Sequence, residues 1–187
     1  VNVTLIFSLS RYAEVIDAYQ AGIEKCTNPS NVHSVASFFV SRVDSAVDKL
    51  LTDNSLKGKA AIANARMAYE LYLEKFKNYP HSHQRPLWAS TGVKDPTYRA
   101  TMYVDSLIAP NTVNTMPPNT LDAVIAAVIE AEDTITPNIE SAKNELLSLA
   151  ALGIDLVKIT DELEADGVEK FMTSWDVLLA EVEKAKQ

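Results

Sequence analysis

The chain has 187 residues, which is long enough for one domain with a substantial core and short for two. Its formal net charge of -8 disfavours nucleic acid and anionic membrane surfaces as partners, because both are negatively charged themselves. No apolar run approaches the roughly 20 residues that a membrane-spanning helix needs. The single cysteine, Cys26, rules out an internal disulfide and indicates a reducing cytoplasm.

Four short stretches have the composition of buried β-strands, and a helical pattern follows each of them. The predicted strands are residues 1–8, 33–40, 86–90 and 112–116. Most positions in them are apolar, which is typical of strands that are covered on both faces. The alternation of strand and helix predicts parallel βα units.

Apolar residues recur every three or four positions between the strands, which predicts amphipathic helices. These helices lie near residues 12–23, 43–51, 57–79 and 119–129, with a further helix from Asp95-Pro96 to about residue 108. Residues 137–187 are predicted as a helical tail, interrupted at Gly153 and divided again at Gly167. A closed (β/α)8 barrel usually needs about 250 residues. The predicted fold is therefore α/β, half of a TIM barrel with four βα units plus C-terminal helices, in a single domain spanning residues 1–187.

Polar side chains interrupt these strands. Asn2 and Thr4 are two residues apart, so both side chains point to the same face of the first strand. Ser37 lies within the second strand and Ser90 ends the third. For any one of these residues the commoner reading is structural: a strand position facing water, or a hydroxyl that satisfies neighbouring backbone groups.

Two cations follow strand ends. Arg42 comes just after the second strand, and Lys94 is four residues beyond Ser90. In (β/α)8 barrels catalytic groups gather at the C-terminal ends of the strands, and phosphate is often bound there. The two cations therefore indicate an anion pocket on an otherwise acidic chain. The alternatives are that Arg42 caps carbonyls or pairs with Asp44, and that Lys94 is a solvated loop charge beside Asp95.

The sequence gives no sign of a metal or a cofactor. His33, His81 and His83 do not combine with a cysteine or a carboxylate at metal-ligand spacing. Neither a P-loop nor a dinucleotide-binding fingerprint occurs. We therefore expect a site built from ordinary side chains.

Four strings, taken together, resemble transaldolase of the longer bacterial form: "NVTLIFSLSRY", "VHSVASFFVSRVD", "PLWASTGVKDP" and "VDSLIAPNTVNTMPPNTLDA". The resemblance covers essentially the whole chain, including the tail "IDLVKITDELEADGVEKFMTSWDVLLAEV". It implies the second half of a (β/α)8 barrel in a cytoplasmic enzyme of the pentose phosphate pathway. Such an enzyme uses no cofactor and transfers a dihydroxyacetone unit between sugar phosphates through a lysine Schiff base. The substrates implied are fructose 6-phosphate, sedoheptulose 7-phosphate, erythrose 4-phosphate and glyceraldehyde 3-phosphate.

The resemblance also implies roles for individual residues. Asn2 would hydrogen-bond hydroxyls of the bound dihydroxyacetone unit, and Thr4 would help to hold the water used in proton transfer, so these two are the predicted catalytic residues. Ser37 would contact the substrate and Arg42 would bind its phosphate.

The second phosphate loop departs from the family pattern. Ser90 and Lys94 are the predicted substrate-binding residues there, but many relatives carry Ser-Phe-Arg where this chain has Ser-Thr-Gly-Val-Lys. The Schiff-base lysine of the family lies on the strand before "NVTLIFS", so we expect it outside these residues and expect the N-terminal half of the barrel as a partner. The alternatives are a non-catalytic sugar-phosphate-binding fragment and, more remotely, an acidic helical scaffold.

Overall fold

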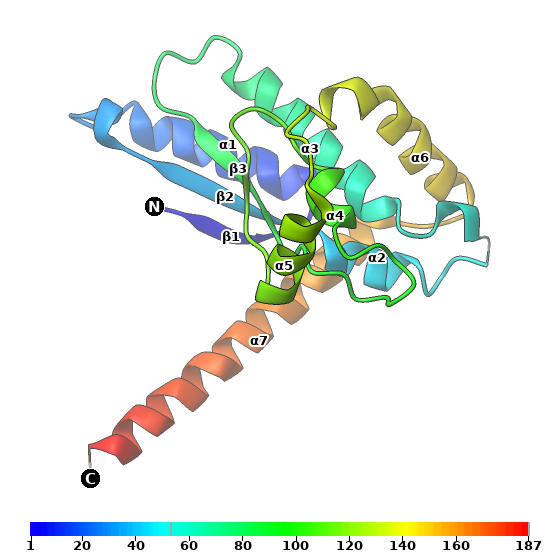
Figure 1. The fold of residues 1–187 in the computed structure, drawn as a ribbon. Helices are drawn as coiled ribbons and strands as arrows, with labels where there is room; N and C mark the ends of the chain where they lie inside the picture. The colour runs from blue at the N-terminus through cyan, green and yellow to red at the C-terminus, as the bar shows by residue number, and fades with distance from the viewer. Residues whose placement is uncertain (53, 187) are drawn as a thin grey trace.

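The computed structural model describes residues 1–52 and 54–186. At its centre is one parallel sheet in the order β1-β2-β3-β4 (Figure 1). The strands are β1 (Val3–Ile6), β2 (Ser34–Phe39), β3 (Gln84–Ala89) and β4 (Val113–Asn114). All four predicted strands are confirmed, although the fourth is reduced to two residues.

Helices follow the strands in the predicted alternation. They are α1 (Leu9–Ile23), α2 (Ser41–Val47), α3 (Ala60–Phe76), α4 (Met102–Asp105), α5 (Pro118–Ala127), α6 (Ile139–Ala151) and α7 (Leu156–Ala185). Short 3-10 turns lie at η1 (Pro29–Asn31), η2 (Asn54–Leu56) and η3 (Thr136–Asn138). Parallel strands joined through helices confirm the α/β class and give the architecture of part of a (β/α)8 barrel.

Helices α1 and α3 cover one face of the sheet. Phe38 and Trp88 point to this face and are fully buried. The Phe38 ring packs edge-on against Tyr12 of α1, and the Trp88 indole Nε1–H donates to the Leu107 carbonyl at 2.9 Å. Figure 1 shows α1 and α3 together on this side, with α6 beyond them.

The opposite face of the sheet, called the open face below, is less covered. Side chains alternate along a strand, so Ser37 and Leu87 point to the open face, and both are only half-buried. Among the described residues, β1 and β4 each pair with one neighbour only, so the sheet has two edges with unpaired backbone groups.

The helix predicted from Asp95-Pro96 is wrong. Asp95 Oδ1 accepts hydrogen bonds from the Thr97 backbone N–H at 2.9 Å and from its hydroxyl at 2.7 Å. These bonds close a local turn two residues on, which competes with helix formation. Regular helix begins only at Met102.

The predicted division of the tail at Gly167 is also wrong, whereas the interruption at Gly153, with φ of 80°, is confirmed. α7 runs unbroken for 30 residues, and Gly167 lies buried within it against Leu5. Beyond Gly167 the helix leaves the body of the molecule (Figure 1). It carries an exposed apolar stripe with three- and four-residue spacing: Val168, Phe171, Trp175, Leu178 and Val182. No helix in the described part of the chain is both long and apolar enough to cross a membrane.

Candidate functional site

The open face carries two of the predicted site residues. Val3 pairs with Ala36, whose side chain is on the helix-covered face, so the next residue, Thr4, lies on the open face. Ser37, which follows Ala36, lies on the same face of the neighbouring strand. Thr4 is exposed and Ser37 is half-buried, so a ligand could reach both hydroxyls.

Asn2 extends the pairing of β1 with β2. Its Oδ1 accepts a hydrogen bond from the Val35 backbone N–H at 3.1 Å. The side chain thus takes the place of a backbone carbonyl at the start of the strand. Its amide group is the part that remains to bind a ligand.

Arg42 is held above the open face. α2 begins directly after β2, and Arg42 is its second residue. The guanidinium lies 5.5 Å from the centre of the Phe39 ring, which is on the same face as Ser37. Its Nη1 is buried and has no hydrogen-bond partner within residues 1–52 and 54–186. A buried cationic donor without an acceptor is unfavourable, so this atom indicates a place for an anion.

Ser90 contacts Ser41, the residue that precedes Arg42 in the chain. The Ser41 backbone N–H donates to the Ser90 carbonyl at 3.0 Å, and the two hydroxyl oxygens are 2.9 Å apart. These contacts continue the β2–β3 pairing beyond both strands. Ser90 has a φ of 56°, so the chain turns sharply where β3 ends. We call Ser41, Arg42 and Ser90 the strand-end cluster. Sequence analysis missed Ser41, although its place between a strand and Arg42 was a usable signal.

Lys94 lies in different surroundings. It is exposed and lines a pocket of about 510 Å³ together with three aspartates, Asp44, Asp48 and Asp95, and two further lysines, Lys49 and Lys57. None of the other five predicted site residues lines this pocket. The structure therefore groups Lys94 with these mixed charges rather than with Arg42.

Asp44 is a buried carboxylate that the sequence analysis weighed only as a partner for Arg42. No ion pair in the described part of the chain joins the two residues. Asp44 instead accepts hydrogen bonds from the Ala61 backbone N–H at 2.8 Å and from the Tyr103 hydroxyl at 2.7 Å. Burial raises the pKa of Asp44 to about 7, although both hydrogen bonds act in the opposite direction. The carboxylate joins α2 to the first turn of α3 and to α4.

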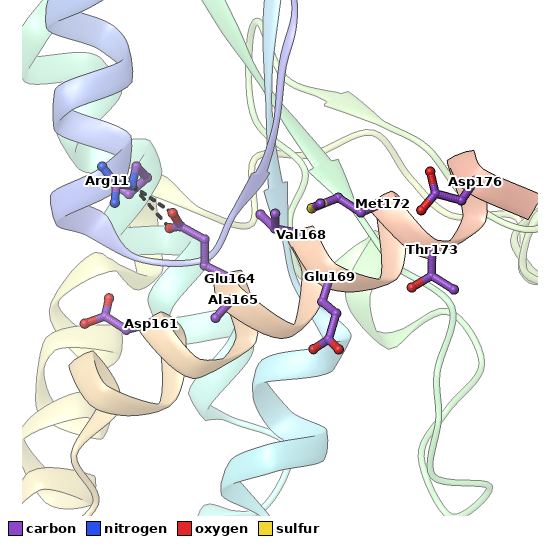
Figure 2. A pocket seen from close by; sticks show the side chains of 9 residues that line it. All are labelled: Arg11, Asp161, Glu164, Ala165, Val168, Glu169, Met172, Thr173 and Asp176. Carbon is purple, nitrogen blue, oxygen red and sulfur yellow. Dashed lines mark hydrogen bonds and ion pairs between the residues drawn. The ribbon is translucent and has the colours of Figure 1, made fainter. Parts of the chain in front are cut away.

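A second pocket, of about 700 Å³, lies along α7 (Figure 2). Four of its nine lining residues are acidic, Asp161, Glu164, Glu169 and Asp176, and Arg11 is the one cation among them. No predicted site residue lines it. Within the described ranges no three His, Cys, Asp or Glu side chains come together closely enough to hold a metal ion.

Comparison with known proteins identifies the family. Residues 1–182 match the family described as Transaldolase/Fructose-6-phosphate aldolase. The chain belongs to this family. Among curated proteins it is 49% identical to "Transaldolase" of Arthrobacter sp. (strain FB24) over 203 aligned positions, which cover 99% of this chain and 55% of that protein. It is also 49% identical to "Transaldolase 1" of Streptomyces coelicolor, with 99% and 53% covered, and 50% identical to "Transaldolase 1" of Streptomyces avermitilis, with 97% and 53% covered. The chain therefore spans about half the length of the curated relatives that it matches.

Proposed function

We propose that this chain supplies the phosphate-binding and donor-binding part of a cytoplasmic transaldolase of the pentose phosphate pathway. The enzyme moves a dihydroxyacetone unit from fructose 6-phosphate or sedoheptulose 7-phosphate to erythrose 4-phosphate or glyceraldehyde 3-phosphate. The observation that carries this proposal is the buried, unpartnered Nη1 of Arg42 at the C-terminal end of β2.

The phosphate end of the substrate lies at the strand-end cluster. Arg42 offers a planar fork of N–H donors, which suits two phosphate oxygens. Packing over Phe39 fixes the guanidinium before the ligand arrives. The hydroxyls of Ser41 and Ser90 donate to the remaining oxygens once they exchange their mutual contact for the ligand.

The sugar end lies on the open face. Thr4 holds the water that shuttles the proton, Asn2 uses its amide group to bind donor hydroxyls, and Ser37 lies between them and the phosphate end. The register supports this order, because Thr4 and Ser37 share a face and Arg42 lies above Phe39, two residues further along β2.

The nucleophilic lysine is proposed to lie outside the described residues. A Schiff-base lysine needs a desolvated pocket that lowers its pKa, so that the free amine is available. The lysines of residues 1–52 and 54–186 lie on helices and connections, and none lies on β1 to β4. The same observation favours a second candidate function, the binding of sugar phosphates without turnover.

The partner proposed for this chain is the remainder of the barrel. The unpaired outer edges of β1 and β4, the open face and the apolar stripe of α7 are surfaces that further strands and helices would cover. We expect the 187-residue chain alone to self-associate or to melt without cooperativity. A monodisperse monomer with a single cooperative transition in sedimentation and calorimetry would contradict this partner.

Measuring phosphate binding tests whether the unpartnered Nη1 of Arg42 marks an anion site. Arg42→Ala should weaken binding of fructose 6-phosphate by about 10- to 100-fold, because hydrogen bonds to charged groups contribute ~1.5–3 kcal/mol. Arg99→Ala is the matched control, since it removes the same group from an exposed ion pair with Asp105. Titration calorimetry measures both variants. Equal affinities for Arg42→Ala and the wild type would refute the phosphate site.

Borohydride reduction in the presence of fructose 6-phosphate tests turnover. It should trap a reduced adduct on a protein that contains this chain together with further sequence, and peptide mapping should place the adduct outside residues 1–187. An adduct on one of the twelve lysines within the chain would contradict the proposed position of the nucleophile. Intact phosphate binding with no adduct on any protein containing this chain would favour the binding function.

A further inference from the structure

The first strand contains an extra residue beside the predicted catalytic threonine. Val3 pairs with Ala36 and Ile6 pairs with Phe38, so β1 advances three residues while β2 advances two. Leu5 takes up the difference with a φ of 61°, a left-handed conformation that is unfavourable for a branched side chain. The strand therefore has a β-bulge at Leu5.

The bulge resolves a conflict in the pattern of side chains. In a regular strand Thr4 and Ile6 would point to the same face, because alternate residues do. Here Ile6 lies opposite Phe38 and is buried on the helix-covered face, while Thr4 remains exposed on the open face. The conformation of Leu5 thus decides whether Thr4 can face a ligand while Ile6 stays in the core.

α7 packs directly on this bulge. Gly167 is buried, and a Cβ built on it would lie 3.1 Å from Leu5 Cδ2 and 3.7 Å from Phe7 Cε2. A contact of 3.1 Å is tighter than almost all real Cβ contacts, so any larger residue would press against the Leu5 side chain. This close approach is the physical reason for a glycine in the middle of a long helix.

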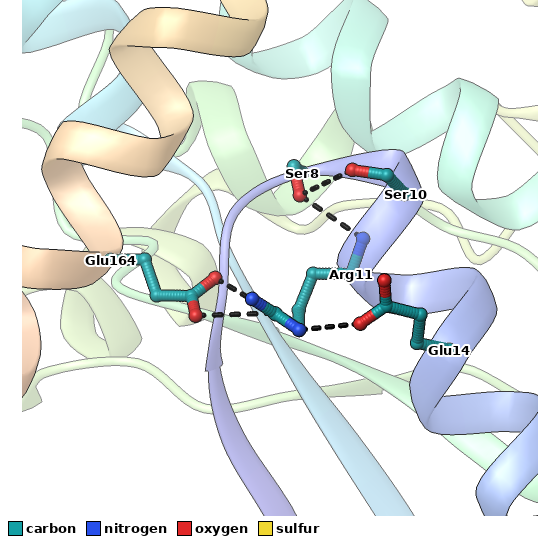
Figure 3. A network of polar contacts seen from close by, with 5 residues as sticks. All are labelled: Ser8, Ser10, Arg11, Glu14 and Glu164. Carbon is teal, nitrogen blue, oxygen red and sulfur yellow. Dashed lines mark hydrogen bonds and ion pairs between the residues drawn. The ribbon is translucent and has the colours of Figure 1, made fainter.

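A polar contact fixes α7 one turn before Gly167. Arg11 Nε donates to both carboxylate oxygens of Glu164 at 3.1 and 3.2 Å, and the same guanidinium pairs with Glu14 (Figure 3). Ser8 is the N-cap of α1, two residues after the end of β1. Its hydroxyl oxygen accepts a hydrogen bond from the Arg11 backbone N–H at 3.1 Å. The end of β1 is thus held between α1 and α7.

We propose that Gly167 is a positioning residue for Thr4: by admitting the Leu5 side chain it holds the β1 bulge, and the bulge directs Thr4 to the sugar end of the site. This inference rests on the proposed function, because it assigns Thr4 to donor binding. Its consequence is selective. Disturbing the contact between Gly167 and Leu5 should affect recognition of the sugar and leave the strand-end cluster, with Arg42, unchanged.

The test compares two helical glycines and two ligands in a protein that contains this chain together with the remainder of the barrel. Gly167→Ala should weaken binding of fructose 6-phosphate by about fivefold or more and leave the affinity for inorganic phosphate within twofold of the wild type. Gly22→Ala is the matched control, since a Cβ there meets nothing within 4 Å, and both of its affinities should stay within twofold. A second variant, Leu5→Ala/Gly167→Ala, makes room for the new methyl group and should recover part of the loss seen in Gly167→Ala.

Each outcome decides the proposal. An equal loss for both ligands, or no loss for either, would overturn it, as would a double variant that binds no better than Gly167→Ala. If Gly167→Ala does not fold, Leu5→Ala alone must reproduce the selective loss of fructose 6-phosphate binding for the proposal to stand. A wild-type chain that binds neither ligand refutes the proposed function instead, which separates the two failures.

Discussion

The connections after β2 and β3 each present a cation, but only the first is built to hold its cation in place. β2 runs straight into α2, and the buried residues of that helix include Val43, Asp44 and Val47. After β3 the chain passes through turns over residues 91–101 before α4 begins, and Lys94 is exposed in a pocket lined by both aspartates and lysines. Similar spacing from a strand end therefore gives one fixed cation and one solvated cation.

This difference has an energetic meaning for anion binding. The Arg42 guanidinium already packs on Phe39, so it loses little conformational freedom when a phosphate binds. Lys94 is exposed, so its side chain would have to become ordered when an anion binds. The connection after β2 is therefore the preorganised one, and its anchor is Asp44.

The largest effect expected from this anchor is a dependence of stability on pH. Burial raises the pKa of Asp44 from 3.8 to about 7 in the folded protein. The folded state then binds a proton that the unfolded state has lost, so this group makes the free energy of unfolding fall as pH rises from about 4 to about 7. Measured against Asp44→Asn, the wild type should lose on the order of 4 kcal/mol across that range.

Urea denaturation at a series of pH values measures this difference in a protein that contains this chain together with the remaining strands, where a cooperative transition is expected. The comparison with Asp44→Asn cancels the other titrating groups. Asp48→Asn, at the end of α2, is the control. It should keep most of the wild-type dependence, because burial of Asp44 is the main cause of the raised pKa and the Asp48 charge adds the least. Parallel stability curves for the wild type and Asp44→Asn would show that Asp44 does not titrate in this window.

A smaller effect is expected at the tyrosines that bind the two carboxylates. Tyr103→Phe removes the hydroxyl that donates to buried Asp44 at 2.7 Å, and it should lower the free energy of unfolding by about 1–3 kcal/mol. Tyr98→Phe removes an equally short bond to half-buried Asp48, and it should lower that energy by less than about 1 kcal/mol. Urea midpoints at pH 8 compare the variants. Equal losses would mean that the buried bond to Asp44 stabilises the fold no more than the half-buried bond to Asp48.

The strands were predictable from sequence because short, mostly apolar stretches alternate with helical patterns, as residues 33–40 do with the segments on either side. Alternation along a strand predicted a shared face for Asn2 and Thr4, but it could not place Thr4 beside Ser37, because that depends on the register between β1 and β2. The anchor of α2 was not, since Asp44 bonds to residues 17 and 59 positions away, and no local pattern reports such partners.

Two errors of the sequence analysis arose because one residue type serves two purposes. Asp95-Pro96 fits a helix start, but an aspartate can also bond to its own neighbours and close a turn, as it does with Thr97. Gly167 fits a helix break, but a glycine is also needed where a helix closely approaches a strand. In both cases the tertiary surroundings decide between the purposes.

Lys94→Ala should have the smallest effect on stability and on phosphate affinity. It tests the contrast between the cation after β2 and the cation after β3 most directly. An exposed lysine among carboxylates contributes little, so the free energy of unfolding should stay within about 0.5 kcal/mol of the wild type. Affinity for inorganic phosphate should change by less than about threefold, against the ~10- to 100-fold loss expected for Arg42→Ala. Titration with phosphate at fixed ionic strength measures the affinities of the Lys94→Ala and Arg42→Ala variants, and urea denaturation measures the free energy of unfolding. If Lys94→Ala instead lost tenfold or more, the turns after β3 would have to move toward the strand-end cluster when the anion binds, because the pocket that Lys94 lines includes neither Arg42 nor Ser90.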